Sequence, residues 1–124
     1  MGKVLIIDDE AAIGTYLGKL IERLGHQATT VQTATQALTL MSNSDIELVI
    51  ADICLPDVPD PEEWIGQLST HAAGRPVVLI SGAPSNALSE CAKSHGIIAF
   101  LSKPFELTFI KNILKTVFDP LSQP

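Results

Sequence analysis

The sequence contains only two cysteines, Cys54 and Cys91, which are too few for a disulfide framework and lack the spacing of a zinc site. Aromatic residues make up 5% of the chain, and no apolar run approaches the roughly 20 residues that a membrane-spanning helix requires. Basic residues are also scarce, since eight Lys and Arg stand against fourteen Asp and Glu, for a net charge of −6. Direct nucleic-acid binding is disfavoured, because contacts to phosphates supply most of that affinity.

The N-terminus lacks the long apolar stretch and the small-residue cleavage site of a signal peptide. We therefore expect a cytoplasmic protein without a membrane partner. With 124 residues, of which 46% are hydrophobic, the chain has the size and composition of one packed domain, which we place at residues 1–119. We interpret residues 120–124, which include two prolines, as a tail or the start of a linker.

Short apolar runs alternate along the chain with apolar residues at helical spacing. The runs predict strands at 4–7, 28–31, 48–51, 77–80 and 97–101. The helical spacing predicts helices around 13–24, 34–41, 64–68, 87–92 and 109–117. This alternation predicts an α/β fold with a flavodoxin-like, doubly wound parallel sheet. Its five strands would have the order 2-1-3-4-5, with five flanking helices.

Chemically active side chains follow four of the predicted strands. Asp8 and Asp9 follow the first, Asp52 the third, Ser81 the fourth and Lys103 the fifth. Because ligands bind at the carboxyl ends of the strands in such sheets, we expect these side chains to gather there. Clustered carboxylates repel one another, and an all-oxygen set of ligands favours a hard cation such as Mg²⁺ or Mn²⁺. A carboxylate nucleophile, a metal ion, an ammonium and a hydroxyl together suit phosphoryl transfer.

Four segments carry a family resemblance: VLIIDDE at 4–10, LVIADICLP at 48–56, VVLISGA at 77–83 and FLSKPF at 100–105. In this order, and at these strand ends, they resemble the receiver domain of response regulators in two-component signal transduction. The resemblance extends over essentially the whole chain. It implies a phosphoacceptor switch rather than an enzyme, one that catalyses only its own phosphorylation and slow autodephosphorylation.

The resemblance also implies a role for each residue of the site. Asp52 would be the phosphoacceptor, and Lys103 would contact the phosphoryl group. Asp8, Asp9 and Asp52 would hold Mg²⁺ together with the backbone carbonyl of Cys54, Asp9 most directly. The Lys103–Pro104 peptide bond would be cis.

A conformational switch at Ser81 and Phe100 is implied as well. Ser81 would move toward the phosphoryl group and Phe100 into the space that it vacates, changing the surface of the fourth helix, fifth strand and fifth helix. The implied partners are a sensor histidine kinase or histidine phosphotransfer protein and a downstream effector domain or protein. The cognate kinase, the output and a phosphorylation-dependent homodimer are left open.

The sequence departs from the family's pattern in two places. Residues 55–61 contain three prolines and lack the family's usual glycine, which predicts a stiff loop after the phosphorylation site. Cys54 and Ala83 occupy positions that tune dephosphorylation in the family. Neither side chain can position an attacking water as an amide or a carboxylate would, which predicts a long-lived phosphoryl group on Asp52.

Three alternatives to a phosphoacceptor are a phosphatase, a flavin or nucleotide binder and a pseudo-receiver. A phosphatase with an aspartyl nucleophile commonly carries a second acid two residues after it, where this chain has Cys54. A flavin or nucleotide binder needs a Gly- or Ser/Thr-rich phosphate loop after the first strand, where this chain has acids. The remaining alternative is a pseudo-receiver, a protein-interaction module that is not phosphorylated.

Overall fold

The computed structural model describes residues 2–43 and 45–118. Within them, parallel strands alternate with helices as predicted, in the sheet order β2-β1-β3-β4-β5. The strands are β1 (Lys3–Ile7), β2 (Gln27–Val31), β3 (Leu48–Asp52), β4 (Val77–Ser81) and β5 (Ala99–Ser102). The helices are α1 (Ala11–Arg23), α2 (Ala34–Met41), α3 (Pro61–Ala72), α4 (Asn86–Ser94) and α5 (Leu107–Phe118). The predicted fold and strand order are confirmed.

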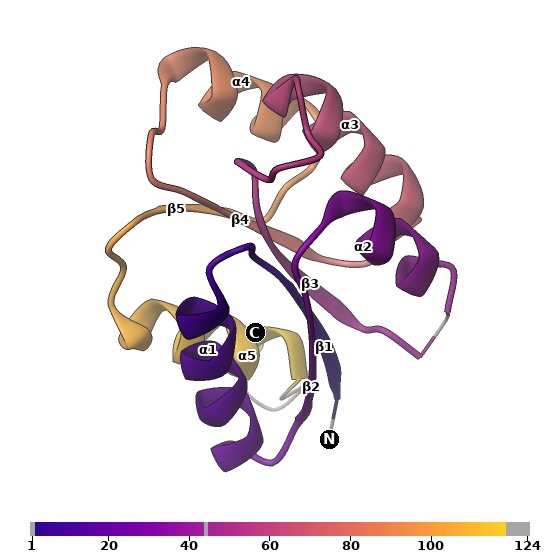
Figure 1. The fold of residues 1–124 in the computed structure, drawn as a ribbon. Coiled ribbons are helices and arrows are strands. Elements are labelled where there is room, and N and C mark those ends of the chain that lie inside the picture. The colour runs from indigo at the N-terminus through magenta and orange to yellow at the C-terminus, as the bar shows by residue number, and fades with distance from the viewer. Residues whose placement is uncertain (1, 44, 119–124) are drawn as a thin grey trace.

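Helices cover both faces of the sheet, with α1 and α5 on one side and α2, α3 and α4 on the other (Figure 1). Side chains of a strand point alternately to the two faces, so the central strands supply both layers of the core. In β1, Leu5 and Ile7 pack with α2 and α3, whereas Val4 and Ile6 pack with α1 and α5. The continuous apolar runs in the sequence reflect this burial on both faces.

Local sequence signals explain several of the helix ends. Gly25 follows α1 with a φ of 90°, a left-handed conformation that glycine adopts without a steric penalty. The side chain of Thr33 caps α2 by accepting a hydrogen bond from the backbone N–H of Gln36. Helix α3 begins at Pro61 directly after the N-cap Asp60, and the proline-rich loop therefore ends at residue 60.

The last strand differs from its predicted extent of 97–101. Strand β5 begins at Ala99, and the side chain of Ile98 is 50% exposed, although its backbone N–H donates to the carbonyl of Val77. Among the described residues, no helix is long and apolar enough to cross a membrane. The cytoplasmic location remains a prediction. So does the domain boundary at 119, and the predicted tail at 120–124 lies outside the described residues.

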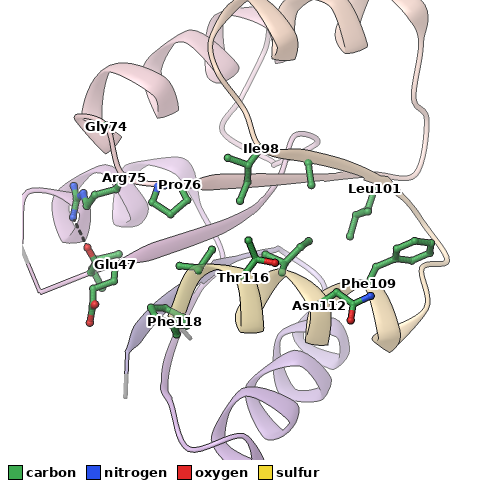
Figure 2. A pocket seen from close by; sticks show the side chains of 14 residues that line it. Glu47, Gly74, Arg75, Pro76, Ile98, Leu101, Phe109, Asn112, Thr116 and Phe118 are labelled. Carbon is green, nitrogen blue, oxygen red and sulfur yellow. Dashed lines mark hydrogen bonds between the residues drawn. The ribbon is translucent and has the colours of Figure 1, made fainter. Parts of the chain in front are cut away.

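A groove of about 890 Å³ lies between α5, strand β5 and the segments that precede β3 and β4, and Figure 2 shows the side chains that line it. Arg75 lies at one end of this groove. Its guanidinium donates hydrogen bonds to backbone carbonyls at the ends of α2 and α3 and in the connection before β3. The acceptors are Met41, Asn43, Ile46, His71 and Ala72. This single side chain thereby joins three segments that are distant in sequence.

Candidate functional site

The register of the sheet brings the strand-end residues together. Ile7 of β1 pairs with Ala51 of β3, so Asp8 and Asp52 follow at the same level on neighbouring strands. Strand order reverses between β1 and β3, the place where ligands bind in doubly wound sheets. On the other side of β3, Ser81 of β4 pairs with Ser102 of β5, and the N–H of Lys103 donates to the carbonyl of Ser81 at 2.8 Å.

Lys103 is the centre of a cluster of carboxylates. Its Nζ lies 2.7 Å from Oδ2 of Asp52, 3.1 Å from Oδ2 of Asp8 and 2.7 Å from Oε1 of Glu10. Asp8 and Asp52 are almost fully buried, with side chains 1% and 4% exposed, whereas Glu10 is exposed. The structure therefore brings together three of the residues that the sequence placed in the site: Asp8, Asp52 and Lys103.

The charges in this cluster shift the pKa values of its members. Burial raises the pKa of Asp8 above its ordinary value, because the lowering effects of the Glu10 N–H and of Lys103 do not outweigh it. Burial lowers the pKa of Lys103, but hydrogen bonds to Asp52, Glu10 and Asp8 overcome this effect and hold it above its ordinary value. Lys103 is thus a fixed positive charge between acids.

The donor set fits a hard cation. Carboxylate oxygens of Asp8, Glu10 and Asp52 all lie within 4.8 Å of one another. Oδ1 of Asp8 accepts a hydrogen bond from the N–H of Glu10 at 2.8 Å, and its buried Oδ2 lies against the ammonium of Lys103 at 3.1 Å. These three acids share the Lys103 ammonium, so negative charge is in excess in the cluster, and Mg²⁺ is a cation that carboxylates bind. The observed cluster is therefore compatible with a divalent metal ion.

The observed cluster differs from the predicted set of ligands at two residues. Asp9 is exposed and does not belong to the group formed by Asp8, Glu10 and Asp52. The predicted site residues did not include Glu10, although it belongs to the same acidic run. Glu10 occupies the N-cap position of α1 without a side-chain capping bond, so its carboxylate reaches Lys103 instead.

The main chain around Asp52 is held by two further hydrogen bonds. The N–H of Cys54 donates to Oδ1 of Asp52 at 2.8 Å, and the indole N–H of Trp64 donates to the Asp52 carbonyl at 3.1 Å. Trp64 is 1% exposed and comes from α3. No sequence signal marked it as part of the site. Partial burial, then the Asp52 charge, raises the pKa of the Cys54 thiol.

The two predicted switch residues lie on adjacent strands. Ser81 is fully buried, and its Oγ accepts a hydrogen bond from the N–H of Ala83 at 3.0 Å. Phe100 is half-buried and packs against the core cluster that includes Ala92 of α4. It also borders a hollow of about 300 Å³ between the start of α4 and the end of β5. The Lys103–Pro104 bond is cis, as the resemblance implies.

Comparison with known proteins agrees with this fold. The family model of the response regulator receiver domain matches residues 4–115, and the chain belongs to this family. Receiver domains are phosphoacceptor switches that interact with histidine kinases and effector domains.

Two curated relatives resemble the chain in sequence. The response regulator protein FleR of Pseudomonas aeruginosa is 31% identical over 106 residues, which cover 84% of this chain and 22% of FleR. The transcriptional regulator NtrC of Rhizobium meliloti is 25% identical over 122 residues, 98% of this chain and 25% of NtrC. The chain therefore spans about a quarter of the length of these curated relatives.

A solved structure shows the same fold. The beryllofluoride-activated receiver domain dimer of NtrC4 superposes with a TM-score of 0.85 at 26% identity, covering 98% of this chain and 100% of that one.

Proposed function

We propose that Asp52 accepts a phosphoryl group from a phosphohistidine of a sensor histidine kinase or a histidine phosphotransfer protein. The observation that carries the proposal is the 2.7 Å contact between the buried Asp52 carboxylate and Lys103, at the sheet edge where ligands bind. Family membership supports it, because receiver domains act as phosphoacceptor switches.

The proposed transfer uses the atoms that the site presents. A carboxylate oxygen of Asp52 attacks phosphorus, the phosphorus–nitrogen bond breaks, and its electron pair remains on the imidazole nitrogen of the donor. When the other ring nitrogen of the donor carries no proton, the released nitrogen takes one from solvent, and the product is neutral imidazole. Lys103 releases its contact with one carboxylate oxygen and offsets negative charge on the transferred group.

We propose Asp8, Asp9, Asp52 and the backbone carbonyl of Cys54 as the ligands of Mg²⁺ or Mn²⁺. The buried carboxylate of Asp8, within 4.8 Å of that of Asp52, supports a place for Asp8 in this set. When bound, the cation supplies positive charge that offsets the charge on the phosphoryl oxygens. Asp9 enters the set on the family resemblance, since its side chain is exposed here.

The proposed switch begins at Ser81. Its hydroxyl exchanges the N–H of Ala83 for a phosphoryl oxygen, and Phe100 moves toward the space that Ser81 leaves. The surface of α4, β5 and α5 changes shape as a result, and an effector domain or protein responds to it. The activated NtrC4 receiver is described as a dimer, which supports a phosphorylation-dependent homodimer as one form of the output.

The proposal is tested by incubating the protein with acetyl phosphate or phosphoramidate in the presence of Mg²⁺ and measuring its intact mass. We expect a gain of one phosphoryl group that is absent from Asp52→Asn and absent when the metal ion is chelated. Lys103→Ala should still gain some phosphoryl group without the conformational change. If the wild type gains none from either donor, the pseudo-receiver alternative replaces the proposal. The gathered Asp52, Lys103 and Asp8 do not favour that alternative.

A further inference from the structure

The proline-rich loop after Asp52 is fastened to a helix that precedes it in the chain. Oδ1 of Asp57 accepts a hydrogen bond from the N–H of Ala34 at 2.9 Å. Oδ2 of Asp57 accepts from the N–H of Thr35 at 3.0 Å and from its hydroxyl at 2.9 Å. Both oxygens of one exposed carboxylate thus bind the first turn of α2, more than twenty residues away in sequence.

This contact is a strong one for a surface side chain. A carboxylate at the N-terminus of a helix accepts charge-assisted hydrogen bonds and interacts favourably with the helix dipole. The N–H groups of Ala34 and then Thr35 hold the pKa of Asp57 below its ordinary value, so the carboxylate stays ionised at neutral pH. Asp57 is therefore a charged anchor at physiological pH.

Capping α2 does not require Asp57. The helix has its own N-cap, because the hydroxyl of Thr33 accepts from the N–H of Gln36 at 3.2 Å. What Asp57 adds is a connection between α2 and the loop of residues 53–60. The start of the loop is held separately, because the N–H of Ile53 donates to the carbonyl of Ile80 in β4 and Ile53 and Leu55 are buried. After Leu55, the N–H of Val58 bonds only locally to the Leu55 carbonyl, so Asp57 is the residue that fastens this part of the loop to α2.

We propose that Asp57 is a positioning residue that holds the loop of residues 53–60 so that the backbone carbonyl of Cys54 stays available to the metal ion. The inference rests on the proposed function, in which Cys54 is a ligand. Cys54 lies three residues before Asp57, and its N–H is already engaged by Asp52. Without the anchor the part of the loop after Leu55 gains conformational freedom, and binding the cation at Cys54 must then order it at a cost in free energy.

The test measures Mg²⁺ affinity by isothermal titration calorimetry and by the fluorescence of Trp64, the only tryptophan of the chain. We expect Asp57→Ala to raise the dissociation constant by about tenfold, the lower end of the effect of removing a group that orients a metal ligand. Circular dichroism checks that the variant is folded. If it is not, Asp57→Asn, which keeps the side-chain shape and one acceptor oxygen, takes its place with a smaller expected loss.

Two matched variants separate positioning from other effects. Thr33→Ala weakens a cap of the same helix without touching the loop, and Asp60→Asn removes a charge from the same loop while keeping a good N-cap. Both should bind Mg²⁺ within about twofold of the wild type at an ionic strength that screens exposed charges. Equal affinity of wild type and Asp57→Ala, or an equal loss in Asp60→Asn, overturns the inference. Absence of Mg²⁺ binding by the wild type overturns the proposed metal site and, with it, the inference.

Discussion

Replacing Trp64 by phenylalanine tests whether the indole hydrogen bond supports the main chain of Asp52. The substitution leaves the buried Asp52 carbonyl without the indole donor that now lies at 3.1 Å. A buried polar group left unsatisfied costs about 1–3 kcal/mol. The smaller ring also leaves a void in the core around α3, for which we add about 1 kcal/mol. The expected loss is therefore about 2–4 kcal/mol of unfolding free energy.

The assay is urea denaturation followed by circular dichroism, because the variant lacks the tryptophan whose fluorescence would otherwise be used. With a dependence of about 1.5 kcal/mol per molar urea, the midpoint should fall by about 1–3 M. Ile65→Val, at a fully buried neighbour in α3, removes apolar volume alone and should cost about 1 kcal/mol. If Trp64→Phe shifts the midpoint no more than Ile65→Val does, the hydrogen bond contributes nothing and the reasoning fails.

Three further predictions concern other residues. Asp8→Asn should raise the midpoint of thermal unfolding at pH 7 with the metal ion chelated, because the raised pKa of Asp8 means that its charged form is disfavoured in the fold. This gain in stability should shrink as the pH falls toward the unfolded pKa of about 3.8. An unchanged midpoint at pH 7 would contradict this prediction. Arg75→Lys should lower the unfolding free energy, measured by urea denaturation, by about 2–3 kcal/mol, since an ammonium cannot donate to all five carbonyls that the guanidinium reaches. A loss below about 0.5 kcal/mol, the usual size for a surface substitution, would contradict this prediction. The phosphoryl group on Asp52 should be long-lived, and Cys54→Asn should shorten its half-life in a time course of intact mass. A wild-type half-life of seconds would show that Cys54 and Ala83 do not slow hydrolysis.

The strand ends were predictable because they follow from a local pattern and a general property of parallel sheets. Apolar runs that end in Asp8, Asp52 and Ser81 are visible without any structure. Once these runs are strands of one parallel sheet, their carboxyl ends share an edge. The helix starts were less predictable where proline and acidic residues follow one another. The structure shows that Asp60 caps α3, which places the start of this helix at Pro61.

The sequence pattern could not predict which side chains meet across long sequence separations. Glu10 meets Lys103 across 93 positions, and Asp57 meets Ala34 across 23. Such contacts depend on the path of loops and on the rotamers that packing allows, neither of which has a periodic signature. Trp64 shows the same limit, because its apolar ring predicts burial but not which carbonyl its N–H will face.

The sequence by itself determined the alternation of strands and helices, the order of acid, acid, hydroxyl and lysine along the strand ends, and the resemblance to receiver domains. These follow from periodicity and from motifs read along the chain. Only the tertiary structure decided that Glu10 joins Asp8 and Asp52 around Lys103, that Asp8 and Asp52 are buried there, and that Asp57 fastens the loop to α2. The physical reason is that hydrogen bonds and charges act over a few ångströms in space, whatever the distance along the chain.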